Sequence, residues 1–195
     1  MSAIDEAAET ILRGGLVVYP TDTLWGLGAL MDDEPTVRRV FDVKKRPLTE
    51  PLSIAVGSTD EITDYAYVTP AARRLLSLLP GPLTIVLEKR ETVPDIVTAG
   101  GKTVGIRVPG HPECLELLAE TGAITATSAN LHGGPEPQTL EEARTIFGER
   151  VDFYLEAGST PLGRPSTLVD ATVEPVRIIR SGAIRDSRIR ELFLD

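Results

Sequence analysis

Apolar residues recur along this chain with two alternating patterns, one typical of helices and one typical of buried strands. Residues 2–13 carry apolar side chains at helical spacing and begin with a capping box of Ser2 and Asp5. After Gly14-Gly15, an apolar run over residues 16–19 indicates a buried strand. The same patterns predict further helices at 35–46, from 58, at 70–79, 112–120 and 139–147, and from 186. They predict further strands at 52–56, 83–88, 104–108, 124–127, near 153, at 167–169 and at 176–179.

Strands and helices alternate throughout, which favours an α/β fold whose sheet is covered by helices on both faces. The length of 195 residues suits one domain with a sizeable core, so we expect residues 1–195 to form a single domain. The start of the chain lacks the pattern of a signal peptide, and no apolar run approaches membrane-spanning length. We therefore expect a cytoplasmic protein without a membrane partner.

A loop that faces a ligand is expected directly after the first strand. Pro20 ends the strand by withholding a backbone donor, and Gly26 and Gly28 let the chain pass close to whatever binds. Residues 21–23 would then present hydroxyl and carboxylate groups at the exit of the strand, where α/β sheets tend to hold ligands.

Charge narrows the classes of ligand. The net charge of −9 argues against a general nucleic-acid-binding surface, which needs clustered Lys and Arg. Only four of the 20 basic residues are lysines, and two of these, Lys44 and Lys45, stand beside Arg46. This distribution predicts an anion-binding cleft within an otherwise negative protein. Cys114 is the only cysteine, which excludes an internal disulfide, and we expect it to pack as a small apolar residue.

The chain contains no phosphate loop, dinucleotide turn or nucleophile elbow, so ordinary ATPase, Rossmann and hydrolase functions lose support. Basic and hydroxyl residues nevertheless stand at predicted strand ends. They are Thr23, Lys44, Arg46, Arg107, Ser128, Asn130, Ser166 and Arg180. Guanidinium and ammonium groups suit phosphate oxygens, so this set predicts a site for a polyphosphate and a small polar acid.

Each of these residues has a simpler alternative role. Thr23 could cap its turn, and the Lys44–Arg46 cluster could complement a helix dipole. Ser128 and Asn130 could be ordinary turn residues, and Arg180 could be a surface charge. His111 is expected to be a solvated loop residue. Arg107 differs because a guanidinium within an apolar strand needs a partner, which favours a site.

Six segments, in order, resemble the motifs of the YrdC-like family, the L-threonylcarbamoyladenylate synthases. The first is Y-P-T-D-T-L-W-G-L-G at residues 19–28. The others are Lys44-Lys45-Arg46-Pro47 with Pro51-Leu52, Pro80-Gly81-Pro82-Leu83-Thr84, Val104-Gly105-Ile106-Arg107-Val108-Pro109, Ser128-Ala129-Asn130 with Gly133, and Pro165-Ser166-Thr167 with Ile179-Arg180-Ser181-Gly182. Single motifs of this kind occur by chance, whereas six in register do not.

The resemblance implies a YrdC-like fold, a twisted mixed sheet with an open concave active-site cleft, and a nucleotidyltransferase activity. L-Threonine, bicarbonate or CO2, and ATP would give threonylcarbamoyl-AMP and pyrophosphate, for threonylcarbamoyladenosine (t6A) modification of tRNA by downstream transferase machinery. Thr23 and Ser166 would hold threonine. The ATP phosphates or the carbamate would meet Lys44, Arg46, Arg107, Ser128, Asn130 and Arg180, with Lys44 and Arg46 catalytic. Mg²⁺ would bind mainly through the phosphates, and the sequence does not identify a protein ligand for it.

The chain departs from the family pattern at several positions. Trp25 stands where tyrosine is usual, Asp22 where glutamate is common, and Ala55 where histidine is frequent. The substitution at Ala55 leaves the contacts of threonine open. We expect no additional C-terminal domain. Two alternatives remain, an RNA-binding module of the same fold, with weak RNA contact, and a paralogue that uses another acceptor.

Overall fold

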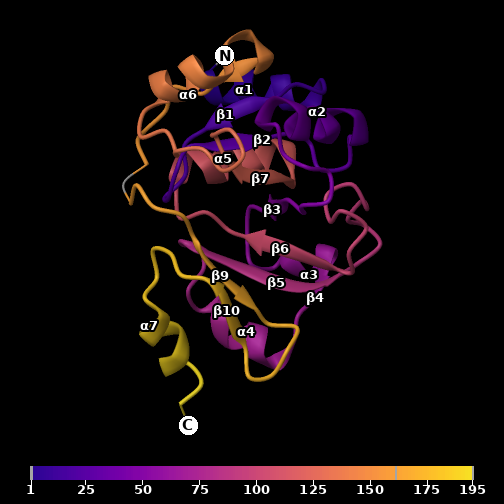
Figure 1. Cartoon of the computed structure of the whole chain (residues 1–195), viewed down its shortest axis with the longest axis vertical. Helices are drawn as coiled ribbons and strands as arrows, with labels where there is room; N and C mark the ends of the chain where they lie inside the picture. Colours follow the sequence, from indigo (N-terminus) through magenta and orange to yellow (C-terminus); the bar gives the residue numbers. More distant parts are fainter. Residues whose placement is uncertain (1, 161, 195) are drawn as a thin grey trace.

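The computed structural model describes residues 2–160 and 162–194, and in these residues ten strands form one mixed sheet (Figure 1). The predicted domain, residues 1–195, includes Met1, Pro161 and Asp195, which lie outside the described residues. The strands are β1 Val17–Tyr19, β2 Gly26–Gly28, β3 Ser53–Ala55, β4 Ala66–Tyr67, β5 Leu83–Lys89, β6 Thr103–Arg107, β7 Ile124–Ser128, β8 Phe153–Tyr154, β9 Thr167–Asp170 and β10 Arg177–Arg180. The helices are α1 Ala3–Leu12, α2 Glu34–Lys44, α3 Ile62–Tyr65, α4 Pro70–Leu76, α5 Pro112–Thr121, α6 Leu140–Phe147, the short 3₁₀ helix Gly148–Arg150 and α7 Asp186–Glu191.

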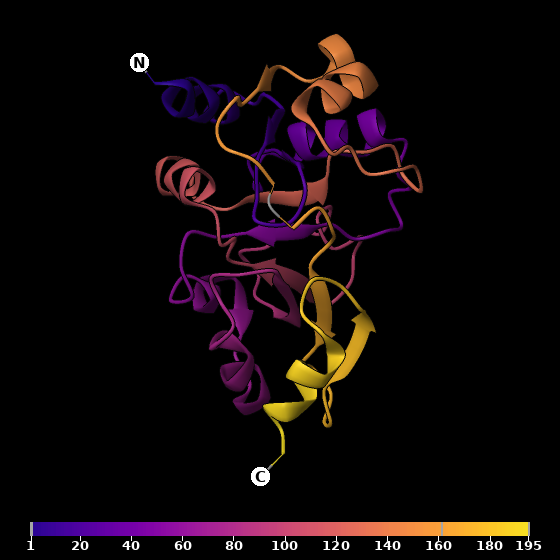
Figure 2. The ribbon, with the colours of Figure 1, turned by 90° about the vertical axis from the view of Figure 1, so that its left-hand side faces the viewer.

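The strands follow the order β10-β9-β5-β6-β3-β7-β2-β1-β8, with β4 paired to β5. The pairs β1–β8, β3–β6 and β5–β9 are parallel and the remaining pairs are antiparallel. Figure 2 shows α1, α5 and α4 on one side of the sheet and α2 and α6 on the other. The predicted mixed α/β sheet with helices on both faces is therefore confirmed.

The first strand and the residue before it are packed on both faces, which explains why residues 16–19 are all apolar. Val17 and Tyr19 pack with apolar side chains of α1 and α5, whereas Leu16 and Val18 pack in the larger core with α2 and α6. Successive side chains of a strand point to opposite faces, so a strand covered on both faces must be apolar throughout. Cys114 on α5 is fully buried in the smaller core, which confirms the packing role.

Local capping signals position the helices. The Ser2–Asp5 capping box closes α1, and the predicted caps Thr69 and Thr139 accept from the main-chain N–H of Ala72 and Glu142 at 3.0 and 3.1 Å. Helix α2 begins at Glu34, one residue before the proline, because the Asp33 side chain caps it.

The helix predicted from residue 58 was placed too early. Helix α3 begins at Ile62 and has no side-chain cap. The hydroxyl of Ser58 donates to the carboxylate of Glu61 at 3.0 Å, and the N–H of Gly57 donates to the same carboxylate at 3.3 Å. The Glu61 side chain thus closes a turn ahead of the helix, and the Ser58-x-x-Glu61 pattern marks that turn.

Residues 26–28, predicted as part of a loop, form strand β2 between β1 and β7. The two glycines of β2 leave room for the ring of Tyr19 on the neighbouring strand. A Cβ atom added at Gly26 would lie 2.8 Å from Cζ of Tyr19, and one at Gly28 would lie 2.8 Å from Cε1. The close approach that these glycines permit is therefore first of all to a tyrosine of the protein itself.

The prediction that His111 is a solvated loop residue is wrong. Its side chain is buried, with Nε2 2.9 Å from the carbonyl oxygen of Ser159 and Nδ1 3.1 Å from the carboxylate of Glu113. The chain after β8 lies against the ring, since a Cβ atom added at Gly158 would lie 3.0 Å from Cε1 of His111. Among the described residues, no helix combines the length and the apolar character that crossing a bilayer requires.

Candidate functional site

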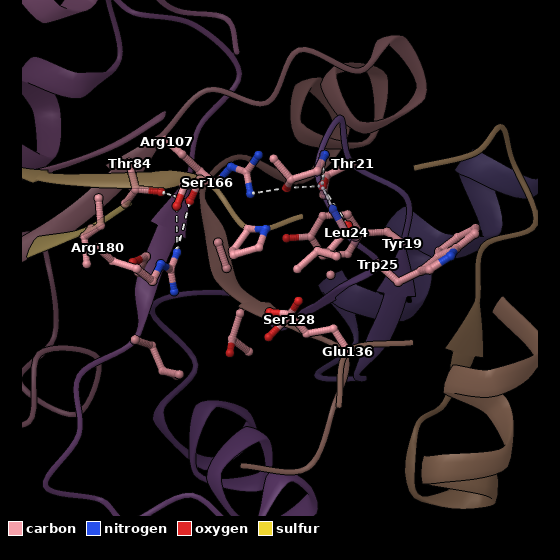
Figure 3. A pocket seen from close by; sticks show the side chains of 18 of the residues that line it. Tyr19, Thr21, Leu24, Trp25, Thr84, Arg107, Ser128, Glu136, Ser166 and Arg180 are labelled. Atoms are coloured by element: carbon pink, nitrogen blue, oxygen red, sulfur yellow. Dashed lines mark hydrogen bonds between the residues drawn. The ribbon is translucent and has the colours of Figure 1, made fainter. Parts of the chain in front are cut away.

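A cavity of about 210 Å³ lies where four segments distant in sequence meet (Figure 3). These segments are residues 19–26 from the end of β1 to the start of β2, residues 46–53 from the end of α2 to the start of β3, residues 126–136 around the end of β7, and residues 165–180 at β9 and β10. Thr84 of β5 and Arg107 of β6 complete the lining. The loop after β1 and the ends of several strands therefore come together at one place, as the sequence predicted.

Arg107 and Thr23 form the deep wall of the cavity, and Asp22 forms a buried ion pair with Arg107 behind the lining. Arg107 donates from Nη2 to the carboxylate of Asp22 at 2.6 Å and from Nη1 to the hydroxyl of Thr23 at 3.1 Å. The two charged side chains are only 11% and 7% exposed. The predicted partner of Arg107 exists, and it comes from the same segment as Thr23. Its fixed geometry makes this wall a rigid base for a ligand.

A second group of hydroxyls belongs to the parallel pair β5–β9. The hydroxyls of Thr84 and Ser166 lie 2.8 Å apart, and Nη2 of Arg180 donates to the carbonyl oxygen of Ser166 at 3.0 Å. Partial burial lowers the pKa of Arg180, an effect that the nearby carboxylate of Glu136 opposes. Figure 3 shows the guanidinium of Arg180 beside Ser166 at the edge of the cavity.

Arg46 lines the cavity from the segment that follows α2. Its guanidinium donates to the carbonyl oxygens of Glu50 and Pro51 at 3.1 and 2.9 Å, and the carboxylate of Glu50 lies 3.4 Å away. Desolvation lowers the pKa of Arg46, and the charge of Glu50 opposes this effect. The carbonyl contacts fix the orientation of the side chain while leaving part of its positive charge for an anion in the cavity.

Lys44 lies behind the cavity wall, in the core rather than in the lining. Its side chain is 2% exposed. The ammonium donates to the carbonyl oxygens of Ser128 and Asn130, the latter at 2.7 Å, and to Oδ1 of Asn130 at 3.3 Å. Burial, reinforced by Arg46 and opposed by Glu136, lowers the pKa of Lys44 to about 7.

The Ser128–Asn130 turn is held together by these contacts and by its own side chains. The hydroxyl of Ser128 donates to Oδ1 of Asn130 at 2.6 Å, and Nδ2 of Asn130 donates to the carbonyl oxygen of Gly134 at 2.7 Å. Lysine, serine and asparagine therefore form one connected network. Only Ser128 of the three reaches the cavity.

The structure brings six of the eight predicted residues to the cavity lining. They are Thr23, Arg46, Arg107, Ser128, Ser166 and Arg180. Lys44 and Asn130 support this lining from behind. Ala55, which is fully buried and pairs in register with Arg107, also lies outside the lining. The roles of all these residues toward ligands stay predictions.

Sequence reasoning missed several polar lining residues, among them Tyr19, Thr84 and Glu136. Tyr19 belongs to the apolar run of β1, and Thr84 ends a motif that was noted for its prolines. Glu136 stands between Pro135 and Pro137 after the Ser128–Asn130 turn. Position near a motif was the only available signal for Thr84 and Glu136, because nothing in the local pattern indicates the direction of a side chain.

The described residues contain no group of three or more histidine, cysteine or carboxylate side chains that could hold a metal ion. A magnesium ion at this cavity would therefore take most of its ligands from phosphate groups and water, which is its common mode of binding in nucleotide sites. One carboxylate, that of Glu136, is available beside the cations of the lining.

Comparisons with known proteins agree with this geometry. The Sua5/YciO/YrdC family model, described as "Telomere recombination", matches residues 9–182. A protein of Methanocaldococcus jannaschii is 38% identical over 175 residues, which are 89% of this chain and 83% of the relative. The threonylcarbamoyl-AMP synthase of Pyrococcus abyssi is 37% identical over 190 residues, which are 96% of this chain and 56% of the relative.

The crystal structure of P. abyssi Sua5 complexed with L-threonine has the same fold. It superposes with a TM-score of 0.92 at 36% identity and covers 97% of this chain, whereas the chain spans 56% of that protein. The residues matched by the family model, 9–182, include all those that line the cavity. On the family match, the identity and the shared fold together, this chain belongs to the Sua5/YciO/YrdC family.

Proposed function

We propose that this chain is a threonylcarbamoyl-AMP synthase, a nucleotidyltransferase that makes threonylcarbamoyl-AMP and pyrophosphate from L-threonine, bicarbonate or CO2, and ATP. The observation that carries the proposal is the convergence of guanidinium and hydroxyl groups from four separate segments on one cavity. Relatives named threonylcarbamoyl-AMP synthase and a relative bound to L-threonine support it.

The two parts of the cavity suit the two larger substrates. Thr23 and Ser166, with Thr84 beside Ser166, offer hydroxyls for a small polar amino acid. Arg46 and Arg180 offer guanidinium groups that match phosphate oxygens. Arg107 lies next to Thr23 and would orient the carboxylate or carbamate end of the amino acid.

Ser128 faces the ATP phosphates in this proposal, and Lys44 and Asn130 would act through the turn that presents Ser128. Direct contact of Lys44 with a phosphate would require its ammonium to leave the carbonyl oxygens that now surround it. The role of Arg46 as a catalytic residue is supported more directly, because its guanidinium already lines the cavity.

The chemistry needs positioning and charge rather than a nucleophilic side chain. The threonine amine adds to CO2 to form a carbamate and releases a proton. A carbamate oxygen then attacks the α-phosphorus, the bond to the leaving oxygen breaks, and pyrophosphate departs. Arg46 and Arg180 are fixed near the negative charge that develops there. Magnesium, when bound to the phosphates, would add further positive charge.

The product is a reactive mixed anhydride, so a downstream transferase that acts on tRNA must consume it. A reaction that uses ATP supports a cytoplasmic location. The continuous sheet supports the prediction of a single domain. Weak contact with RNA remains part of the proposal, although the net charge of −9 offers little attraction to phosphate backbones.

Pyrophosphate release tests the function. We expect it to require L-threonine, bicarbonate and ATP together, and to fall to background when any one is omitted. Serine and valine serve as controls, since each lacks one feature of the threonine side chain. Pyrophosphate release that occurs with another amino acid but not with threonine would identify a paralogue. Salt-sensitive tRNA binding without pyrophosphate release would indicate an RNA-binding module instead.

A further inference from the structure

Glu136 is the single carboxylate among the described residues that line the cavity. Its side chain is half-buried and extends into the cavity in Figure 3. The main-chain carbonyl of Glu136 accepts from Nε2 of Gln138 at 3.1 Å. Within the described part of the chain, its carboxylate takes part in none of the hydrogen bonds or ion pairs found, unlike Asp22, which pairs with Arg107. Glu136 therefore presents unused acceptors to the cavity.

The carboxylate lies near two cations without contacting either. Its charge counteracts the lowering of the pKa of both Lys44 and Arg180, which burial causes first of all. Lys44 lies behind the Ser128 turn and Arg180 lies on β10, so Glu136 stands between the two sides of the cavity. A triphosphate that reaches Arg46, Arg180 and Ser128 would pass beside it.

The carboxylate of Glu136 and a triphosphate beside it would repel each other unless a cation lies between them. Screening by water is reduced inside a cavity, so the repulsion would weaken nucleotide binding. Magnesium resolves this conflict, because it commonly binds one or two carboxylates together with substrate phosphates and water. The described residues contain no three-ligand cluster, so phosphates and water would supply the remaining ligands.

We propose that Glu136 is a ligand of the divalent cation that accompanies ATP, in a site that is completed only when the nucleotide is bound. The inference rests on the proposed function for the identity of the nucleotide. It makes Glu136 a contact that couples metal and nucleotide binding. The protein alone would hold the ion weakly, and ATP without metal would meet an opposing charge.

The test compares wild type with Glu136→Gln and with Glu141→Gln as a matched control. Glu141 lies on α6, is 81% exposed, and forms an ion pair with Arg144 at 3.7 Å, outside the cavity. Both variants remove one negative charge at nearly constant volume. Calorimetry measures ATP affinity in two separate conditions, one with excess EDTA and one with excess Mg²⁺. Threonine is left out of both so that no turnover occurs.

In wild type, we expect Mg²⁺ to strengthen ATP binding by about tenfold or more. In Glu136→Gln, affinity for metal-free ATP should rise while the gain from Mg²⁺ falls by about tenfold. Glu141→Gln should match wild type in both conditions. A rise in the affinity for metal-free ATP distinguishes the loss of a metal ligand from general damage to the fold. Damage to the fold would weaken ATP binding both with and without Mg²⁺.

Electron paramagnetic resonance of Mn²⁺ gives a second readout that does not depend on activity. We expect little bound Mn²⁺ with the protein alone, a protein–ATP–Mn²⁺ complex in wild type, and weaker Mn²⁺ binding in Glu136→Gln at saturating ATP. Unchanged metal and nucleotide affinities in Glu136→Gln would overturn the inference. So would a selective loss of threonine affinity, which would make Glu136 the partner of the substrate ammonium group.

Failure of the proposed function gives a different result. Wild-type protein that binds ATP and Mn²⁺ as expected but releases no threonine-dependent pyrophosphate would overturn the synthase function and leave the role of Glu136 standing. Normal pyrophosphate release with no effect of Glu136→Gln on metal binding would overturn the role of Glu136 and leave the synthase function standing. Wild-type protein that binds no ATP would overturn both.

Discussion

The deep wall of the cavity and its rim hold their charges in different ways. At the deep wall, Arg107 is paired with Asp22, which lies behind the lining, and the two side chains are 11% and 7% exposed. On the rim, Arg46 is 21% exposed and bonded mainly to carbonyl oxygens, and the carboxylate of Glu136 stands apart from its neighbouring cations. The charges of the wall are paired before any ligand arrives, although Oδ2 of Asp22 and Nε of Arg107 lack a hydrogen-bond partner within the described residues, whereas the rim is left with net charge to offer. Changes in the wall should therefore affect stability, and changes in the rim should affect activity.

We expect the largest effect on stability from a substitution in the deep wall. Arg107→Ala leaves the carboxylate of Asp22 buried without its partner, which should lower the free energy of unfolding by about 3–5 kcal/mol. Denaturant titration measures this change. The double variant Arg107→Met/Asp22→Asn should recover much of the loss, because it removes both buried charges. A double variant as unstable as Arg107→Ala would show that the ion pair is not the cause.

A change in the rim should lower activity and leave stability nearly unchanged. Arg46→Ala should lower kcat for pyrophosphate release by about 10²–10³-fold, because a fixed cation near the leaving group is lost. Its thermal unfolding should stay close to that of wild type. Lys45→Ala is the matched control, since Lys45 is exposed and adjacent in sequence. Wild-type turnover in Arg46→Ala would remove this residue from the catalytic machinery.

The effect of the network behind the rim should be small for each pH unit and should accumulate as the pH changes. The folded pKa of Lys44 is lowered to about 7 from an ordinary value of 10.5, so the folded chain binds fewer protons than the unfolded chain between these values. Stability should therefore rise with pH from about 7 to 10.5, by up to about 1.4 kcal/mol per pH unit. Denaturant titrations at several pH values should show this slope in wild type and in Lys45→Met.

In Lys44→Met the slope should be reduced, because the titrating group is gone. The variant should also be less stable throughout, since the carbonyl oxygens of Ser128 and Asn130 lose their donor. This expectation differs from a purely catalytic role, in which removal of Lys44 would leave the fold intact. Identical pH slopes in Lys44→Met and Lys45→Met would contradict the lowered pKa.

Features that depend on near neighbours in sequence could be predicted. The caps Ser2, Thr69 and Thr139 act within one turn, and the apolar runs of β1 and β5 mark strands wherever the sheet places them. Strand β2 could not be predicted, because Gly26 and Gly28 are typical of a loop. The close approach of the Tyr19 ring to both glycines, and of Ile124 to Gly28, explains their presence in a strand.

The candidate site was predictable at the level of segments and less so at the level of side chains. The motifs identify which loops meet, yet spacing alone cannot say that Lys44 turns into the core while Arg46 lines the cavity. Lys45, between them, adopts a left-handed conformation with φ of 53°, which ends α2 and changes the direction of the chain. Glu136 was missed for a related reason, since its importance comes from cations on other segments.

The order of the strands has a consequence for how the protein is made. Ser166 precedes β9 and Arg180 ends β10, and β9 joins the sheet beside β5, which is translated much earlier. A nascent chain that has not yet released β10 from the ribosome lacks one whole side of the cavity. Such a chain cannot bind a ligand in the arrangement described, so the cavity would become competent only after β10 has joined the sheet.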